Sequence, residues 1–276
     1  MLVRHLRPLM VGRKIRGVEV RRTKVLHPTA PIVLKRQLEG ATFQSLERRG
    51  KYLLFTLQPA RGRQPVQLVG HLGMTGRMFV TTAKAPLPKH TAVVLDFGRQ
   101  RFVYEDQRYF GRFTLDLRSV AKLGPEPLSL EFSADYLQRE LKRSRQRIKV
   151  KLLDQTLVAG VGNIYASEAL FRSRISPRAR ANKLNRPQIT KLVTAVRKVL
   201  AEAIRFGSTI QLNHGGADAR DGLFYFGRAE GVPDYYEERL RVYDRAGHRC
   251  RRCRTPIRRI VQAARSTFFC PKCQVA

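Results

Sequence analysis

Hydrophobic and polar positions alternate over short stretches between residues 14 and about 117, which predicts a β-rich region. The strands are expected at residues 15–25, 42–46, 52–57, 66–69, 92–97 and 101–104, with turn residues between them. This spacing is typical of a β-sandwich. Three of the interruptions are distinctive: Lys51 at the entrance of a strand, a Gly-bounded loop that presents Met74, and a loop that presents Phe110 among arginines.

A helix is expected before the strands, over residues 2–10. Its apolar face collects Leu2, Leu6, Leu9 and Met10. Pro8 is unfavourable inside a helix because it lacks a backbone donor. The pattern is already running at Met1, with no Ser, Thr, Asp or Asn before it to cap the first amides. We therefore expect that the natural helix begins further upstream.

The pattern changes near residues 124–128, where two prolines and a glycine mark a boundary. Helical segments are expected at residues 132–141 and 148–157, within 158–171 after a Gly-rich turn, and at 189–204, and Gly207 is expected to end the last of them. A Gly-rich turn, residues 160–163, precedes the third segment; it is either a phosphate-binding helix start or an ordinary turn. Residues 208–238, rich in Gly, Asp and aromatic residues, predict a long mobile loop.

The four cysteines form two CxxC pairs near the C-terminus, separated by 16 residues: Cys250, Cys253, Cys270 and Cys273. Two such pairs have the spacing of a tetrahedral, all-thiolate zinc site. Apolar residues between the pairs predict a short β-hairpin that needs its metal to fold. The alternative is two disulfides in a secreted domain, which no signal peptide or other secretory feature supports.

The chain is strongly basic, with 54 Lys and Arg against 21 Asp and Glu, a net charge of +33 and a pI near 11.3. Charge on this scale is typical of a protein that binds a polyanion, and nucleic acid is the expected partner. A membrane surface is the competing polyanion, but there is no run of about 18 apolar residues and no lipidation signal. A solvated basic face without a partner is the remaining alternative.

Several motifs occur in a fixed order from about residue 4 to 274. They are Arg49-Gly50-Lys51-Tyr52-Leu53-Leu54, His71-Leu72-Gly73-Met74, Lys89-His90, Arg108-Tyr109-Phe110-Gly111, Leu123-Gly124-Pro125-Glu126-Pro127-Leu128, the stretch from Gly160 to Glu168, and Arg265 before Thr267-Phe268-Phe269-Cys270. Together they resemble the formamidopyrimidine-DNA glycosylase / endonuclease VIII family of base-excision repair enzymes. The branch that removes oxidised purines is closer, because Met74 and the Arg108-x-Phe110 loop are both present.

The resemblance implies an α+β multidomain fold. Its parts would be an N-terminal β-sandwich with a flanking helix (residues 1–122), a helix-two-turn-helix domain with a lesion-covering loop (123–238) and a C-terminal β-hairpin zinc finger (239–276). It also implies one structural Zn²⁺ and double-stranded DNA with oxidised bases or abasic sites as the partner. A monomer in a bacterial cytoplasm or nucleoid, without membrane attachment, is expected.

The resemblance also implies roles for single residues. Such enzymes bend the duplex and flip the damaged nucleotide out of the stack. Met74 and Phe110 would be apolar wedges, and Arg108 would face the orphaned base. The side chains that would grip phosphates are Lys51, His90, Asn163 and Arg265, with Lys51 and Arg265 also supporting catalysis. Without the resemblance, core packing would explain the wedge residues equally well, and Lys51 would be a solvated lysine at a strand end.

The N-terminal end departs from the family pattern. Family members begin with a Pro-Glu pair, whose prolyl amine forms a Schiff base while the glutamate shuttles protons; this sequence opens Met1-Leu2-Val3-Arg4, and its first carboxylate is Glu19. A start codon assigned too far downstream, on an otherwise active enzyme, is our favoured hypothesis. A catalytically inactive paralogue that binds damaged DNA is the alternative. A basic zinc-ribbon RNA-binding or ribosomal protein fits the charge and the cysteines, but not the Met74 and Phe110 loops.

Overall fold

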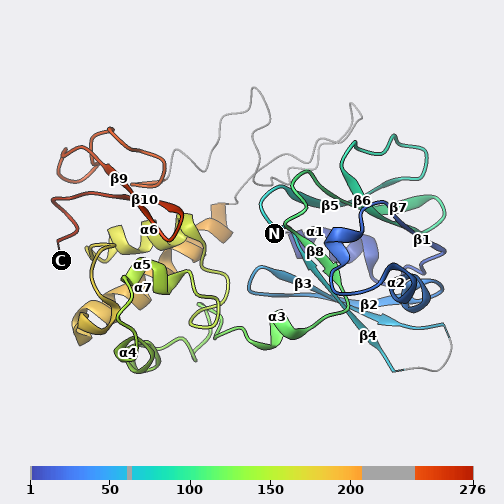
Figure 1. Cartoon of the computed structure of the whole chain (residues 1–276), viewed down its shortest axis with the longest axis horizontal. Coiled ribbons are helices and arrows are strands. Elements are labelled where there is room, and N and C mark those ends of the chain that lie inside the picture. The colour runs from blue at the N-terminus through green and yellow to red at the C-terminus, as the bar shows by residue number, and fades with distance from the viewer. Residues whose placement is uncertain (1, 61–63, 207–239, 276) are drawn as a thin grey trace. The chain divides into compact units, whose positions relative to one another are not determined.

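The computed structural model describes residues 2–60, 64–206 and 240–275, and these form two compact units (Figure 1). The first unit holds residues 2–121, and the second holds residues 122–206 with 240–275. Each unit has a hydrophobic core of its own. Gly207 and the predicted loop at residues 208–238 lie outside the described residues.

The first unit contains two four-stranded antiparallel sheets (Figure 1). One sheet has the order β2-β3-β4-β8 and consists of β2 (Thr42–Arg49), β3 (Tyr52–Gln58), β4 (Val66–His71) and β8 (Arg112–Thr114). The other has the order β1-β6-β7-β5 and consists of β1 (Gly17–Val20), β6 (Thr91–Asp96), β7 (Gln100–Asp106) and β5 (Gly76–Thr82). The β-sandwich prediction is confirmed.

The two sheets and helix α1 (Leu2–Met10) share one core. Alternation along β3 buries Leu53, Phe55 and Leu57. Phe55 meets the rings of Phe43, Phe102 and Phe113 edge-on, at centroid distances of 5.9 to 6.1 Å. From α1, Leu6 and Met10 are fully buried in the same cluster, so the predicted helical face forms even though Pro8 lies within the helix.

Several parts of the first unit differ from the sequence prediction. The expected strand over residues 15–25 is only the short β1, followed by the 3₁₀ helix η1 (Thr23–Leu26). Helix α2 (Pro31–Leu38) was not predicted; Pro31 suits a first helical turn, and Leu34 and Leu38 bury one face. Strand β5 was missed because its apolar residues cluster in the middle instead of alternating. The short helix α3 (Arg118–Ala121) ends the unit.

Helices form the core of the second unit. They are α4 (Ala134–Lys142), α5 (Ile148–Leu152), α6 (Asn163–Arg172), η2 (Ala181–Lys183) and α7 (Arg186–Phe206). Ser133 caps α4 by accepting a 3.1 Å hydrogen bond from the Tyr136 amide. The predicted segment 148–157 is too long: Asp154 accepts bonds from the Thr156 amide and hydroxyl, and this turn ends the helical run early.

The C-terminal hairpin pairs β9 (Arg258–Gln262) with β10 (Arg265–Phe269). Its two-residue turn has positive φ angles at Ala263 (46°) and Ala264 (57°), as a type I′ hairpin turn requires. A small cluster that includes Val242, Ile257, Phe268 and α6 residue Phe171 packs beside it. The predicted α+β architecture is therefore present throughout the described residues.

Candidate functional site

Two loops of the first unit present Met74, Arg108 and Phe110 together. Met74 lies between β4 and β5, and its side chain is 57% exposed, while Phe110, between β7 and β8, is 50% exposed. The Arg108 guanidinium lies 4.8 Å from the Phe110 ring centroid, and its Nη1 lies 3.6 Å from the Met74 sulfur. This exposure excludes core packing as the reason for the two apolar residues.

The backbones of these two loops touch. Gly73 has φ +62°, and a Cβ built on it would lie 2.6 Å from the Gly111 nitrogen. A Cβ on Gly111 would lie 2.4 Å from the His71 carbonyl oxygen. Glycine is required at both positions because any side chain would force the loops apart. The sequence pattern showed two loops, and the structure places them side by side.

His71 stays neutral beneath the Met74 loop. Its Nδ1 accepts a 3.0 Å hydrogen bond from the Gly73 amide, and its ring packs 4.8 Å from that of Tyr52. Burial, with a contribution from the nearby cations Lys51 and Arg112, lowers the pKa of His71 to about 4 against the opposing effect of Asp106. A neutral ring can keep Nδ1 as the acceptor that shapes this loop.

Acidification is expected to destabilise the first unit through His71. The folded-state pKa of about 4 lies below the ordinary histidine pKa of 6.5, so the unfolded chain binds the extra proton between these pH values. The contribution of neutral His71 to the free energy of unfolding is fully present above pH 6.5. It is lost as the pH falls towards 4, and the loss is about 3 kcal/mol at most. The control is His71→Asn, whose Oδ1 replaces the Nδ1 acceptor without titrating. Urea unfolding followed by circular dichroism should show a shallower pH dependence for the variant; equal profiles would contradict this.

The other two predicted cations of the first unit occupy different positions. Lys51 is exposed at the turn between β2 and β3, and its charge contributes to the lowered pKa of His71. His90 is half-buried just before β6, and its carbonyl accepts a 3.1 Å bond from the Asp106 amide. Lys51 is therefore near His71, and the His90 backbone is bonded to Asp106.

In the second unit, Asn163 begins α6 and is tied to the hairpin by a buried lysine. Lys149 Nζ donates to Asn163 Oδ1 (2.6 Å), the Ser266 carbonyl (2.9 Å) and Thr267 Oγ1 (2.7 Å). The Asn163 Nδ2 donates to the same Ser266 carbonyl at 3.0 Å. Burial, together with the charge of Arg265, lowers the pKa of Lys149 to about 8. The helix start and the hairpin are therefore fixed to each other.

Sequence reasoning missed Lys149. The available signal was its position on the buried stripe of α5 with Ile148 and Leu152, where a lysine needs partners. It also assigned no role to Glu168, whose buried carboxylate accepts amide bonds of 2.8 to 3.0 Å from Arg241, Val242 and Tyr243. Glu168 thereby attaches the start of the C-terminal module to α6.

Arg265 is exposed at the first position of β10, directly after the hairpin turn. It pairs across the hairpin with Gln262, while the neighbouring Ser266 and Thr267 hold Lys149. The guanidinium is thus carried on backbone that is restrained on both sides.

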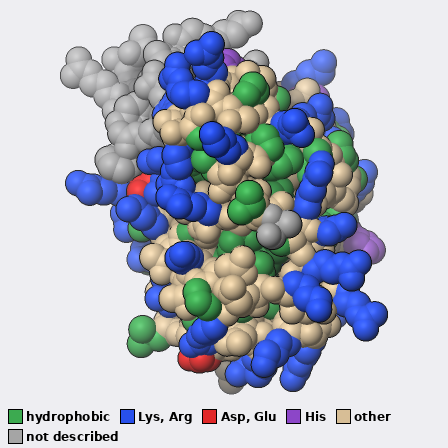
Figure 2. Space-filling model, turned by 90° about the vertical axis from the view of Figure 1, so that its left-hand side faces the viewer, with side chains coloured by type: hydrophobic (Ala, Val, Ile, Leu, Met, Phe, Trp, Pro, Cys, Tyr) green, Lys and Arg blue, Asp and Glu red, His purple; other side chains and the backbone are tan. Residues whose placement is uncertain are grey.

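Lys and Arg side chains cover much of the face seen in Figure 2, and Asp and Glu are sparse there.

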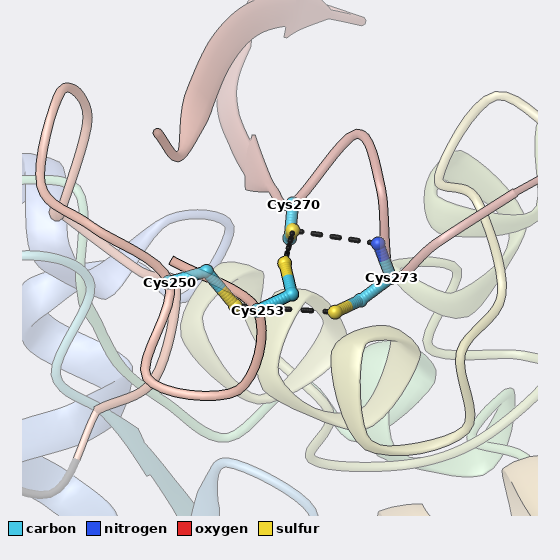
Figure 3. Close-up of side chains that lie close together, drawn as sticks. All are labelled: Cys250, Cys253, Cys270 and Cys273. Atoms are coloured by element: carbon cyan, nitrogen blue, oxygen red, sulfur yellow. Dashed lines mark hydrogen bonds between the residues drawn. The ribbon is translucent and has the colours of Figure 1, made fainter. Parts of the chain in front are cut away.

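The four cysteine sulfurs converge from the two CxxC turns (Figure 3). All four lie within 4.8 Å of one another, with Cys250–Cys273 at 4.0 Å and Cys253–Cys270 at 3.4 Å. Four thiolates around one tetrahedral zinc would be about 3.8 Å apart. Backbone amides of Arg252 and Cys273 point at the Cys250 and Cys270 sulfurs at 3.4 Å, as thiolate acceptors need. The donor set fits zinc.

No helix among the described residues is long and apolar enough to cross a membrane. The first unit offers two exposed apolar side chains beside a cation, and the second unit offers an exposed arginine on a hairpin and a four-cysteine metal centre. Exposed apolar side chains of this kind can insert between stacked bases, and exposed cations can hold a polyanion.

Three family models match the chain in sequence order. They are the formamidopyrimidine-DNA glycosylase N-terminal domain (residues 1–113), the formamidopyrimidine-DNA glycosylase H2TH domain (123–214) and the zinc finger found in FPG and IleRS (247–275). The formamidopyrimidine-DNA glycosylase of Symbiobacterium thermophilum is 43% identical, over 98% of this chain and 86% of that protein.

Two solved structures have closely similar folds. Lactococcus lactis Fpg in complex with DNA containing an abasic site superposes with a TM-score of 0.85 at 33% identity, covering 99% of this chain and 96% of that one. MutM in complex with DNA containing carbocyclic 8-oxo-G gives a TM-score of 0.85 at 32% identity, with the same coverage. The zinc-finger match agrees with the four-cysteine cluster, and the prediction of one structural zinc is confirmed.

Proposed function

The chain belongs to the formamidopyrimidine-DNA glycosylase family, and from that premise we propose that it recognises oxidised purines and abasic sites in duplex DNA and extrudes the damaged nucleotide. Family members are DNA glycosylases and AP lyases of base-excision repair. The observation that carries the proposal is the exposed cluster of Met74, Arg108 and Phe110 on two touching loops. Large exposed apolar side chains beside a cation suit the gap that a flipped nucleotide leaves.

Each residue of the cluster has a separate task in this proposal. Met74 and Phe110 enter the base stack and occupy the vacated space, which offsets part of the cost of unstacking. Arg108 faces the base left without its partner and offers it a planar set of donors. Because the guanidinium already lies over the Phe110 ring, the three side chains enter the duplex as one unit.

The second group of residues supplies grip without reading sequence. Lys51, His90, Asn163 and Arg265 contact phosphates around the extruded nucleotide. Lys51 and Arg265 also support the chemistry by neutralising charge near the reacting sugar. The zinc keeps Arg265 in place, since the metal orders the hairpin that presents it.

We propose that the chemical step requires a prolyl amine and a glutamate ahead of Leu2, as in the family pattern. Among residues 2–20 the single carboxylate is Glu19 on β1, and it bonds to Arg21 at 2.6 Å. The 276 residues are therefore expected to bind lesions without cleaving them. A damage-binding paralogue without catalysis is the second candidate function, supported by the same observation.

Lesion binding tests the proposed function directly. The chain should bind a duplex with a tetrahydrofuran abasic analogue or 8-oxoguanine at least about tenfold more tightly than the undamaged duplex, a factor that corresponds to about 1.4 kcal/mol. Phe110→Ala should remove most of this preference and leave the affinity for undamaged DNA nearly unchanged. Fluorescence anisotropy at fixed salt measures both. Equal affinity of the wild type for damaged and undamaged duplexes would refute the proposal.

Arg265→Ala is expected to weaken binding to all duplexes alike. One fewer phosphate contact should lower the slope of log affinity against log salt by about 1. The bound zinc should stay, because Arg265 holds none of the cysteines. Arg259→Ala, which removes the same charge from β9, is the control, since Arg259 already bonds to Ser266 Oγ. Equal loss of slope in both variants would assign the effect to net charge and contradict a specific role for Arg265.

A further inference from the structure

The buried carboxylate of Asp106 lies where the Met74 loop and the Arg108–Phe110 loop meet. Asp106 is the last residue of β7, and its side chain is fully buried. Its Oδ1 accepts a 2.6 Å bond from the Thr75 hydroxyl and a 3.2 Å bond from the Arg108 amide. Its Oδ2 accepts a 2.8 Å bond from the Gly111 amide. One side chain therefore holds both loops.

The three groups that donate to Asp106 lie next to Met74 and on both sides of Phe110. Thr75 directly follows Met74 in the first loop. The amides of Arg108 and Gly111 lie on either side of Tyr109 and Phe110 in the second loop. Tyr109 has φ 54°, a left-handed conformation that is uncommon for a tyrosine, so local preference does not produce this loop. The Asp106 bonds supply the missing restraint on both flanks of Phe110.

Ladder pairing does not explain these bonds. The Asp106 backbone already pairs with Gly76 of β5 and donates to the His90 carbonyl. The strand would keep its register with another residue at this position. All three side-chain bonds instead run to the loops that carry Met74, Arg108 and Phe110. The carboxylate is thus bonded to the loops that carry the exposed cluster of Met74, Arg108 and Phe110, and not to the β ladder.

We propose that Asp106 is a positioning residue for lesion recognition, whose carboxylate holds the Met74 loop and the Arg108–Phe110 loop in one arrangement before DNA is bound. This inference rests on the proposed function of the cluster. Loops that are ordered in advance do not pay an ordering cost on insertion, so they favour the duplex in which a gap can open. Asp106 acts through the positions of Met74, Arg108 and Phe110 and does not itself contact the DNA.

Asp106→Asn is the most specific test, because asparagine retains the shape of the side chain and replaces one acceptor oxygen with an NH₂ group. In either orientation of the amide, its NH₂ group faces a backbone N–H, that of Gly111 or that of Arg108. A second pair of variants separates the loops: Thr75→Val removes the hydroxyl bond to Asp106, whereas Thr75→Ser keeps it. Asp96→Asn is the matched control, since Asp96 accepts a 2.7 Å bond from the Gly98 amide at the opposite end of β7's hairpin with β6.

The expected result is a selective loss. Asp106→Asn should lower the preference for the abasic-analogue duplex over the undamaged duplex by about tenfold, with the affinity for undamaged DNA within about twofold of wild type. Thr75→Val should show part of this loss, and Thr75→Ser should restore wild-type behaviour. A 2-aminopurine next to the lesion should brighten with wild type and Thr75→Ser but not with Asp106→Asn. Retained preference and brightening in Asp106→Asn would overturn the inference.

Amide exchange of the free protein separates this inference from the proposed function. In wild type, the Arg108 and Gly111 amides should exchange slowly, and in Asp106→Asn both should exchange at least about tenfold faster, while β3 stays protected. Unchanged exchange would refute the positioning role whatever the DNA results. If the exchange changes as expected but wild type shows no lesion preference, the loops are held by Asp106 and it is the proposed function that fails. Loss of protection in β3 as well would mean a global structural role and would also overturn the inference.

Discussion

Removal of zinc from the four-cysteine site is expected to unfold residues 247–275 and to lower affinity for lesion-containing DNA by at least about 100-fold, while residues 2–121 stay folded. The module has few buried apolar residues of its own, so metal ligation supplies most of its stability. Chelation with a strong ligand, followed by circular dichroism, amide exchange and anisotropy, measures each part of this expectation.

The effect should extend beyond the cysteines into the helical core. When β10 is lost, Lys149 loses the Ser266 and Thr267 acceptors and keeps only Asn163 of its three bonded partners. A buried ammonium that keeps one acceptor of three is costly, so the helix start at Asn163 should loosen as well. Faster amide exchange around residues 148–166 would reveal this.

Cys253→Ser is the matched variant for chelation, and added zinc provides the reverse test. The serine variant should resemble the chelated protein, whereas added zinc should restore hairpin protection and DNA affinity to the chelated wild type but not fully to the variant. Arg265→Ala should keep its zinc and its hairpin. Full DNA affinity in a protein shown to be zinc-free would contradict the scaffold role of the metal.

The sequence could predict those features that depend on local spacing. Two CxxC pairs indicated the metal centre, and the motifs of the family resemblance singled out Met74 and Phe110. The missed features depend on long-range contacts. Lys149 finds its acceptors more than a hundred residues away, at Ser266 and Thr267, and Asp106 finds Thr75, 31 residues earlier, just before the neighbouring strand β5. Neither partner can be read from the residues that surround the charged group.

The wrong element boundaries have similarly physical causes. Helix α5 ends early because the side chain of Asp154 offers Thr156 an alternative to helical bonding. Helix α2 has only eight residues, too few for a periodic signal, and its burial of Leu34 and Leu38 depends on a core supplied by the sheets. A local side-chain turn therefore ends α5, whereas tertiary packing forms α2.

Placing a Pro-Glu-Leu-Pro-Glu segment before Leu2 is expected to give efficient borohydride trapping on an abasic-site or 8-oxoguanine duplex, where the 276 residues alone should give none. Trapping needs an amine that attacks the sugar carbon and a nearby acid to move protons. The α-amine of Met1, with an ordinary pKa of about 8, could supply some free amine but has no acid beside it in sequence.

The geometry of the helix explains why no other group should substitute. Leu2 and Val3 pack against the core and fix the first turn of α1, so residues added before them would have a defined direction. Glu19 is ion-paired with Arg21, and Glu39 accepts the Val18 amide at 3.4 Å, so both carboxylates have other partners.

Two controls make the trapping experiment decisive. A Gly-Gln pair in place of the added Pro-Glu should bind the lesion and trap poorly, since it lacks both the secondary amine and the acid. Phe110→Ala within the extended chain should trap less because extrusion is impaired, although the nucleophile is intact. Efficient trapping by the 276 residues alone would refute the requirement for Pro-Glu. Failure of the extended chain, despite tight lesion binding, would instead favour the damage-binding paralogue.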